Sequence, residues 1–464
     1  MIPSRANASP WEAEAMHIVV VGLGQVGLSV VRILEARGHD VVAIDRDSKA
    51  ITHAEDHFDV ATLQGYGASA RVLKAAGCAR ADLIIAVTDQ DETNLVAALT
   101  ARHLGTSKAV ARVQGADWVD IGGEDGVAMG LLGVDAVFNP RVLAARELAR
   151  IARSHGAVEV LELAEGRVEV LQVEVAPGAR AAGRPLVDLR LPQGMRVAAV
   201  VRAGQLMVPG GADVIRSGDR VFLVGLPRVI RDTLPRFAKV EQTGKVAILG
   251  GGVVGSTLAR ALEGTGVAVT VIERNVAVAE ALALELPKTT VIVGDGTDCE
   301  LLDEHDIGTS DLMFGATSDE QVNLMGALVA RRAGVRRTGI IVSRQEYESL
   351  YQQLGIDIVV SPRQMAADVI LRHVRGTEVR SLSALAGGQA ELVELTAPQG
   401  ARAVGRPLME LDLPRGVQIC AVIKANRIVI PGGRDTIEPG DGVILVATAA
   451  THLAATRLFR VARS

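Results

Sequence analysis

The chain has 464 residues, with 49 lysines and arginines against 54 aspartates and glutamates, which gives a formal net charge of −5. This mildly acidic balance excludes a general attraction to nucleic acid or to anionic lipid, and the length predicts about three domains. Hydrophobic residues make up 48% of the chain but aromatic residues only 2%, so the cores must be built from aliphatic side chains, as in parallel α/β layers.

Residues 1–16 are predicted to form a disordered N-terminal extension. Glu12 and Glu14 stand where a signal peptide would need an apolar stretch. Farther along, the longest apolar runs fall far short of the roughly 20 residues that span a bilayer. The three cysteines lie far apart and form no CxxC pair, and so sparse a set favours a reducing compartment. These features predict a soluble, cytoplasmic protein.

Short apolar runs then alternate with helical patterns. The expected strands are 17–22, 41–45, 60–64 and 82–87, and the expected helices are 25–37, 48–57, 69–77 and 91–104. Since parallel strands need crossover connections, this alternation predicts a doubly wound parallel sheet. Asn139 followed by Pro140 is a helix start signal and marks the exit from this domain.

The hydrophobic pattern changes in the next part of the chain. Apolar and polar residues alternate with period two on both sides of Gly166, which indicates antiparallel strands. Further strands are expected at 196–202, 206–209 and 220–225, separated by glycine-containing turns. This part is predicted to be a small α+β module.

The second half of the chain repeats the first in the same order. Gly22 has its counterpart at Gly250, a shift of 228 residues (250 − 22). Farther along, the Pro-Gly-Gly turn at Pro209 recurs at Pro431. Two tandem copies of a two-part unit explain this constant order, and chance does not.

The motif Gly22-x-Gly24-x-x-Gly27 lies between a predicted strand and a predicted helix, and Asp45 ends the next strand. In a dinucleotide-binding motif the first glycine permits a tight turn, the second lets the backbone approach a pyrophosphate, and the third allows close helix–strand packing. The helix N-terminus supplies N–H groups to the phosphates. Asp45 can accept hydrogen bonds from ribose hydroxyls and disfavours a 2′-phosphate. NAD(H) is therefore favoured over NADP(H), and ATP also fits.

The second half repeats this motif with Gly250, Gly252 and Gly255, and with Glu273 in the place of the acid. A strand, a helix and a carboxylate at the same spacing, found twice in one chain, make the motif far more specific than a lone glycine turn. The second site offers fewer polar side chains, since Gly251 lies in its loop. Two nucleotide sites are therefore predicted.

Polar residues also follow the strands that lie deeper in each sheet. Thr88 with Asp89, and Thr317 with Ser318, come just after a strand's carboxyl end, where open α/β sheets bind ligands. Their hydroxyls could contact ribose or adenine, or they could cap the helices that follow. The sequence leaves both interpretations open, and they are compatible.

Arg112 and Arg344 each end a strand-like run in their half of the chain. A guanidinium group there could bind a phosphate through two hydrogen bonds. The alternative is a surface ion pair.

No catalytic or metal site is predicted. His53 and His57 lie one helical turn apart, as zinc ligands do, but no third ligand is evident and a solvated helix face is favoured. The sequence contains no GxSxG elbow, and no cysteine has a recognisable base partner.

The duplicated order resembles a known family. Two dinucleotide-binding domains, each followed by a module with Gly-Arg-Pro-Leu and Pro-Gly-Gly, resemble tandem RCK domains, the regulators of potassium conductance. The stretches that begin at Ile18, Gln64 and Ala86 are similar to those of the TrkA family, the regulatory subunits of Trk potassium uptake. The resemblance covers residues 17–460. The extension 1–16 lies outside it and departs from the family's usual start at the first strand. The resemblance implies Rossmann-like RCK-N domains 17–154 and 241–376, and α+β RCK-C domains 155–240 and 377–464.

The resemblance also implies a function. Members of this family are peripheral proteins on the cytoplasmic face of the cell membrane and are not enzymes. They form homo-oligomeric rings, implying a tetramer, bind NAD(H) and ATP or ADP, and gate a separate membrane subunit that translocates potassium. Carried over by motif, the first site is Gly22, Leu23, Gly24, Gln25, Val26, Gly27, Asp45, Thr88, Asp89 and Arg112. The second site is Gly250, Gly251, Gly252, Val253, Val254, Gly255, Glu273, Thr317, Ser318 and Arg344.

Two alternatives remain. An NAD-dependent dehydrogenase would need a substrate domain with a proton donor or acceptor that faces the nicotinamide. Here a second copy of the same binding fold takes that place, and no His, Lys or Tyr stands out. The other alternative is a nucleotide-sensing regulator of a different cation transporter.

Overall fold

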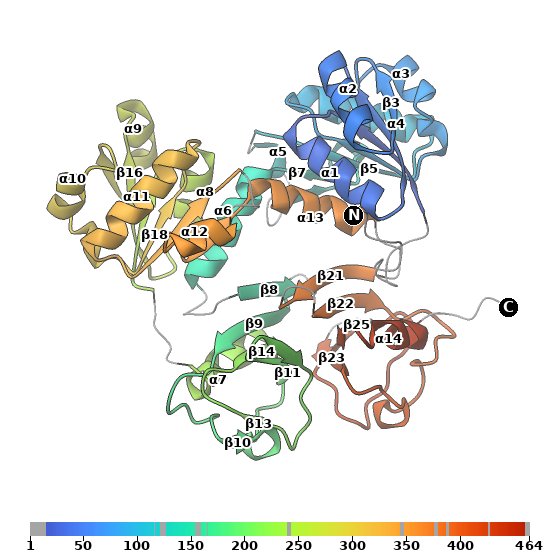
Figure 1. Ribbon diagram of the computed structural model, residues 1–464, viewed down its shortest axis with the longest axis vertical. Coiled ribbons are helices and arrows are strands. Elements are labelled where there is room, and N and C mark those ends of the chain that lie inside the picture. The colour runs from blue at the N-terminus through green and yellow to red at the C-terminus, as the bar shows by residue number, and fades with distance from the viewer. Residues whose placement is uncertain are drawn as a thin grey trace. The chain divides into compact units, whose positions relative to one another are not determined.

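The computed structural model is shown in Figure 1. It describes residues 15–115, 117–120, 127–153, 159–164, 166–238, 243–343, 348–374, 379–386, 389–425 and 427–459. The described residues fall into two compact units. The doubly wound unit comprises the described residues of Glu14–Arg153 and Thr243–Val374, and the antiparallel unit comprises those of Ser154–Gln242 and Arg375–Ser464. Residues 1–14 of the predicted extension lie outside the described residues.

The first half of the doubly wound unit is a seven-stranded sheet in the order β3-β2-β1-β4-β5-β7-β6. All its neighbouring strands are parallel except β6, which runs antiparallel to β7. Its strands are β1 His17–Val21, β2 Asp40–Asp45, β3 Ala61–Gln64, β4 Leu83–Ala86, β5 Lys108–Arg112, β6 Val127–Met129 and β7 Ala136–Phe138. Its helices are α1 Gln25–Ala36, α2 Ser48–His57, α3 Ala70–Ala75, α4 Asp91–Leu104, α5 Asp117–Asp120 and α6 Pro140–Arg153.

The second half of this unit repeats the arrangement with six parallel strands in the order β17-β16-β15-β18-β19-β20. Its strands are β15 Lys245–Leu249, β16 Ala268–Glu273, β17 Thr290–Val293, β18 Leu312–Gly315, β19 Arg337–Ile341 and β20 Ile358–Val360. Its helices are α8 Val253–Leu262, α9 Val276–Glu285, α10 Cys299–Glu304, α11 Glu320–Ala333, α12 Glu348–Gln353 and α13 Pro362–Val374. The predicted class, with two doubly wound parallel sheets, is confirmed.

The central strands are apolar beyond their first residues because helices cover both faces of each sheet. Ile18 to Val21 of β1 and all four residues of β4 are buried. β1 lies between β2 and β4 in register, so that Ile18 pairs with Val41 on one side and with Leu83 on the other. This buried layer holds the carboxyl ends of the strands in fixed positions.

The last helix of each half packs on the opposite half. Leu148 of α6 belongs to the same buried cluster as Leu258 of α8, although α6 ends the first half. Ile370 of α13, which ends the second half, lies in the cluster that contains Val30 and Leu34 of α1. Figure 1 shows α13 beside α1, and α6 beside α8. The two halves therefore exchange their exit helices and share two hydrophobic cores.

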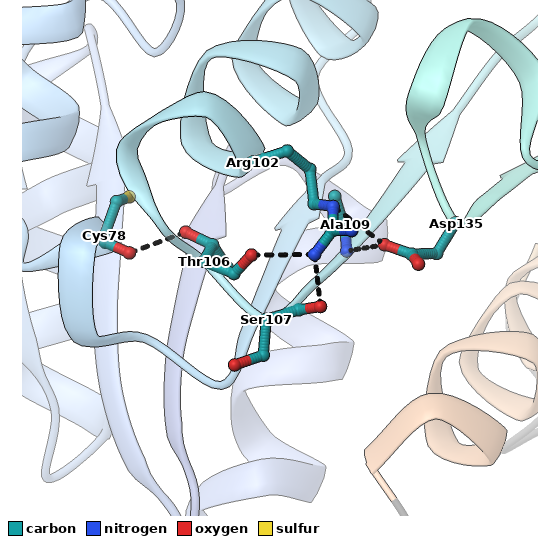
Figure 2. A network of polar contacts seen from close by, with 6 residues as sticks. All are labelled: Cys78, Arg102, Thr106, Ser107, Ala109 and Asp135. Carbon is teal, nitrogen blue, oxygen red and sulfur yellow. Dashed lines mark hydrogen bonds and ion pairs between the residues drawn. The ribbon is translucent and has the colours of Figure 1, made fainter.

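A polar network lies at the amino-terminal ends of β5 and β7 in the first sheet, opposite the crevice end of the strands (Figure 2). Arg102 of α4 donates to the Thr106 carbonyl at 2.9 Å, and the Thr106 hydroxyl donates to the Cys78 carbonyl at 2.7 Å. Asp135 accepts from the backbone N–H of Ala109 at 2.7 Å and lies 3.4 Å from Arg102 Nε. The carboxylate thus ties the segment before β7 to β5 and to the end of α4.

The second half repeats this network. Arg331 of α11 pairs with Asp357 at 2.9 Å, and Asp357 accepts from the backbone N–H of Thr338 at 2.8 Å. The carboxylate links the segment before β20 to the neighbouring strand β19, as Asp135 links the segment before β7 to β5. The repeated network shows that the duplication extends to side-chain contacts.

The antiparallel unit contains two five-stranded sheets, in the orders β12-β11-β14-β9-β8 and β21-β22-β25-β23-β24. The first module has β8 Glu159–Leu163, β9 Val168–Glu174, β11 Met195–Arg202, β12 Gln205–Met207, β14 Arg220–Gly225 and α7 Pro227–Thr233, with the short pair β10 Arg184–Pro185 and β13 Val214–Ile215. The second has β21 Val379–Leu385, β22 Ala390–Thr396, β23 Val417–Lys424, β24 Arg427–Val429, β25 Gly442–Thr448 and α14 His452–Phe459. The antiparallel strands predicted for the first module are present.

The two small modules share one core. Phe222 and Ala421, from β14 and β23, belong to the same buried cluster. The Arg196 guanidinium of the first module donates to the Ile419 carbonyl of the second at 2.7 Å. The backbone N–H of Ala164 donates to the buried Glu394 carboxylate at 3.2 Å. Apolar packing and buried hydrogen bonds therefore join the modules into one unit.

Each small module also contains an ion pair next to its glycine turn. In the first module, Arg202 donates to Asp219 through Nε at 2.8 Å and Nη2 at 2.7 Å, and the backbone N–H of Arg216 donates to the same carboxylate at 2.7 Å. The Asp219 side chain is only 3% exposed. In the second module, Lys424 takes the place of the arginine and lies 3.2 Å from Asp441.

We expect the variant Asp219→Asn to lower the free energy of unfolding by about 2 kcal/mol at pH 7, since it removes a buried charge-assisted pair. The hydrogen bond from Arg202 holds the pKa of Asp219 below its usual value. A lowered pKa in the folded state adds stability above the unfolded value of about 4, and this stability is lost as the pH falls through the folded pKa. Urea unfolding should therefore show a difference between variant and parent at pH 7 that shrinks below pH ~4.

The matched control is Glu438→Gln, because Glu438 pairs with Lys424 but its side chain is 67% exposed. An ion pair with an exposed carboxylate is screened by solvent and contributes little to stability, so the control should change the unfolding midpoint only slightly. A difference for Asp219→Asn that stayed constant between pH 7 and pH 3 would contradict the assignment of the effect to its charge.

Candidate functional site

A crevice of about 520 Å³ lies at the carboxyl ends of the first sheet's strands. Its lining residues follow β1, β2, β4 and β5 and include the starts of α1 and α6. The chain order reverses between β1 and β4, which is the switch point where open α/β sheets bind ligands. The crevice is therefore placed by the topology of the sheet.

The three glycines of the first motif have three different environments. Gly22 has φ +98°, and a Cβ there would lie 2.8 Å from the backbone nitrogen of Thr88. A Cβ on Gly27 would lie 1.8 Å from the Gly22 carbonyl oxygen. A Cβ on Gly24 would meet no atom within 4 Å, although Gly24 lines the crevice. The first and third glycines are required by the fold, and the second leaves space beside the backbone for a ligand.

Helix α1 begins in the wall of this crevice. Gly24 is its N-cap, and no side chain caps it. The first turn of an α-helix has N–H groups without an intrahelical partner, and its positive end attracts anions. Gln25 and Val26, the first two residues of α1, line the crevice. This wall is suited to phosphate groups.

Asp45 lies at the end of β2 and faces the crevice. Its Oδ2 accepts from the backbone N–H of Leu23 at 2.6 Å, and its Oδ1 accepts from that of Asp47 at 2.9 Å. These two bonds fix the orientation of the carboxylate. Each carboxylate oxygen has a second acceptor position, so Asp45 can still accept from a ribose hydroxyl.

A buried asparagine positions the loops behind the crevice. Asn94 Oδ1 accepts from the Thr88 backbone N–H at 2.8 Å and from its hydroxyl at 2.7 Å, while Nδ2 donates to the carbonyls of Thr88 at 3.0 Å and Arg112 at 2.8 Å. The N-cap of α4 is Gln90, so the interpretation of Thr88 as the helix cap is wrong. Its hydroxyl instead donates to Asn94 Oδ1, and the helix begins after Gln90, two residues later. This role of Asn94 was not predicted from the sequence.

Arg112 provides a positive charge inside the crevice. Its Nε is buried and has no hydrogen-bond partner in the structure. Burial, and next the nearby charge of Arg141, lower the pKa of Arg112 below its ordinary value. No ion pair of Arg112 is found among the described residues, which disfavours the surface ion-pair interpretation. A partly buried guanidinium with an unused, buried donor fits an anionic ligand.

A second crevice, of about 560 Å³, lies at the equivalent place in the second sheet. Gly250 has φ +101°, a Cβ on Gly252 would meet no atom within 4 Å, and a Cβ on Gly255 would lie 1.8 Å from the Gly250 carbonyl oxygen. Glu273 Oε2 accepts from the backbone N–H of Gly251 at 2.6 Å. The glycine turn and its carboxylate are thus built in the same way in both halves.

The loop after β18 is also held as in the first half. Asn323 Oδ1 accepts from the Thr317 backbone N–H at 2.9 Å and from its hydroxyl at 2.7 Å. Its Nδ2 donates to the carbonyls of Thr317 at 3.1 Å and Ile341 at 3.2 Å. Asp319 caps α11. The capping interpretation is therefore wrong for Thr317 as well, and equally for Ser318.

Most of the predicted site residues line the two crevices. In the first crevice these are Gly22, Gly24, Gln25, Val26, Asp45, Thr88, Asp89 and Arg112. In the second they are Gly250, Gly252, Val253, Val254, Glu273, Thr317 and Ser318. Leu23, Gly27, Gly251 and Gly255 are not among the lining residues. Arg344 falls in a segment that the structure does not describe.

Other lining residues were not predicted. They include Arg46, Tyr66, Gln114, Asn139, Arg141 and Arg363 in the first crevice. The repeated Gly-x-Gly at 65–67 and the Asn-Pro helix start are the sequence signals that point to Tyr66 and Asn139. Arg363 belongs to the other half of the chain, and no local pattern could have indicated it.

Within the described residues, no group of three or more His, Cys, Asp or Glu side chains could hold a metal ion. Burial raises the pKa of the Cys78 thiol to about 11 and that of Cys420 to about 12, so both stay protonated at neutral pH.

Among the described residues, no helix is both long enough and apolar enough to cross a bilayer.

Family comparisons cover most of the chain. Residues 18–140 and 246–362 match the TrkA-N domain, and residues 170–238 and 392–460 match the TrkA-C domain. The chain is 33% identical to the Trk system potassium uptake protein TrkA homolog of Archaeoglobus fulgidus, over 93% of this chain and 97% of the relative. It is 32% identical to the Trk system potassium uptake protein TrkA of Vibrio alginolyticus, over 93% of this chain and 95% of the relative.

The fold is similar to that of a solved channel protein. The GsuK channel has a TM-score of 0.63 at 20% identity, over 97% of this chain and 81% of that chain. The GsuK channel bound to NAD has a TM-score of 0.61 at 20% identity, over 98% of this chain and 81% of that chain. At this level of identity the likeness shows a common fold.

Proposed function

The chain belongs to the TrkA family of Trk system potassium uptake proteins, and on this premise we propose that it is the nucleotide-sensing regulatory subunit of a Trk-type potassium transporter. The membrane subunit that translocates potassium is its proposed partner. We further propose that the chain is cytoplasmic, binds peripherally at the inner face of the membrane, and assembles as a homo-oligomer, a tetramer. The single observation that carries the proposal is the pair of glycine-turn crevices in a chain of this family.

The proposed ligands are NAD(H) and ATP or ADP. In the first crevice, the start of α1 and Arg112 would hold phosphates, and Asp45 would hold a ribose. The space beside Gly24 and the unused Nε of Arg112 fit such a ligand. In the second crevice, the start of α8 and Glu273 would have the same roles. The role of Arg344 stays a prediction.

A nucleotide regulates the transporter only if it binds two conformations with different affinity. Its proposed phosphate and ribose contacts come from separate elements, namely the start of α1, the end of β2 and the end of β5. A change in the spacing of these elements would therefore change the affinity. A difference of a few kcal/mol is enough to invert a modest population bias.

The lining residues support sensing rather than turnover. Among those that the structure describes in both crevices, none is a histidine, lysine or cysteine. A dehydrogenase needs a proton donor or acceptor beside the nicotinamide. Tyr66 lines the first crevice, but its hydroxyl is already engaged in a hydrogen bond of 3.2 Å with the Thr93 hydroxyl. We propose that the bound nucleotide is held without being transformed.

Potassium uptake by cells that lack this chain tests the proposal. We expect slow uptake in those cells, restored by the parent chain and not by a chain with Gly24→Ala and Gly252→Ala. Normal uptake without the chain would favour a regulator of another cation transporter. Oxidation of NADH by the purified chain with any member of a panel of carbonyl compounds would favour the dehydrogenase alternative.

A further inference from the structure

Two arginines at equivalent places in the repeat line both crevices. Arg141 is the second residue of α6, and Arg363 is the second residue of α13. Each side chain lines the crevice of its own half and also that of the opposite half. No other arginine lines both crevices among the residues that the structure describes. The two sites therefore meet at this pair of side chains.

The exchange of exit helices explains this placement. α13 packs on α1 through Ile370 and its neighbours, which brings the start of α13 to the first crevice. The Arg363 guanidinium donates to the side-chain amide oxygen of Gln25, the first residue of α1. The guanidinium group thus lies at the helix N-terminus, where the unpaired N–H groups favour an anion.

Arg141 has a comparable position beside Arg112. Both arginines line the first crevice, and the charge of Arg141 contributes to lowering the pKa of Arg112. Like charges that converge in a partly buried crevice repel one another, and a bound anion relieves this repulsion. Guanidinium groups form the strongest hydrogen bonds of this kind with phosphate oxygens.

We propose that Arg141 and Arg363 are phosphate-binding residues that the two crevices share, so that each crevice depends on an arginine from the opposite half of the chain. This inference rests on the proposed nucleotide-binding function and goes beyond the motif, which assigns each site only residues of its own half. A ligand with a pyrophosphate or a longer phosphate chain is the class that both arginines would contact.

The test measures ADP binding to the first crevice alone. The variant Gly252→Ala is expected to close the second crevice, because its methyl group would occupy the space beside the backbone. In this background, Arg363→Gln should weaken ADP binding roughly tenfold in calorimetric titrations, as expected for one lost charge-assisted contact. The ADP affinity of Arg363→Lys should lie between that of Arg363→Gln and that of the chain that keeps Arg363. The dependence of the affinity on salt should also decrease in Arg363→Gln.

The matched control is Arg71→Gln, which removes the same charge from an exposed position on α3 outside both crevices. We expect less than a twofold change for this variant. Unchanged ADP affinity in Arg363→Gln, or an equal loss in Arg71→Gln, would overturn the shared-arginine proposal alone. Failure of the unsubstituted chain to bind ADP and NADH would instead overturn the proposed function, and this inference with it.

Discussion

The variant Gly24→Ala is expected to lose nucleotide binding in the first crevice while it keeps the stability of the parent chain. Gly24 has φ −69° and ψ −170°, an extended conformation that alanine adopts without strain. A methyl group there would meet no protein atom within 4 Å, but it would lie at the N-cap of α1 inside the crevice. It would keep phosphates away from the helix N-terminus. The loss of two charge-assisted hydrogen bonds reduces affinity on the order of 100-fold.

Calorimetric titration with NADH and with ADP measures this loss. Gly252→Ala provides the matched control, since the same substitution lies at the equivalent position of the second crevice and should leave the first one intact. The melting temperature of Gly24→Ala should equal or slightly exceed that of the parent, because alanine lowers the entropy of the unfolded chain. Parent-like affinity in the first crevice of Gly24→Ala would contradict the placement of the phosphates at α1.

The variant Gly27→Ala, three residues later, is expected to lower the stability of the chain, which Gly24→Ala leaves unchanged. A Cβ on Gly27 would lie 1.8 Å from the Gly22 carbonyl oxygen, so α1 and the turn before it must move apart. Backbone offers no alternative rotamer, and overpacking of this kind costs about 3 kcal/mol or more. Urea unfolding should therefore show a clear loss of stability for Gly27→Ala.

Gly255→Ala should destabilise the second half in the same way, because its Cβ would also lie 1.8 Å from a carbonyl oxygen, that of Gly250. Gly24→Ala is the matched control for both variants. If Gly27→Ala unfolded at the same urea concentration as Gly24→Ala, the packing role assigned to the third glycine would be wrong.

Local patterns were sufficient to predict the central strands and their helices. Residues 18–21 and 83–87 are uniformly apolar because helices cover both faces of the sheet, and β1 and β4 lie within the predicted strands 17–22 and 82–87. The helix predicted at 69–77 is shorter, since α3 ends at Ala75 and Gly77 takes a left-handed conformation with φ +81°. The strands β6 and β7 have three residues each, too few for a periodic signal.

The sequence predicts the site residues that each half contributes to its own crevice, but not those that come from the opposite half. The glycines, Asp45 and Arg112 follow strand ends in sequence, so their convergence follows from the parallel sheet. Periodicity identifies the apolar stripe of α13 but not the surface that it covers, so the arrival of Arg363 at the first crevice could not be foreseen. The buried contacts of Asn94 likewise depend on two loops that are separate in sequence.

The exchange of α6 and α13 is the arrangement by which two separate copies of one chain would form a swapped dimer. Here one polypeptide contains both copies, so dilution cannot separate them and their association does not depend on protein concentration. Covalent linkage also removes the requirement that both copies keep identical binding loops. At equivalent positions of the repeat, the first motif has Leu23 and Gln25 and the second has Gly251 and Val253. Fusion thus allows one molecule to carry two receptors of different selectivity.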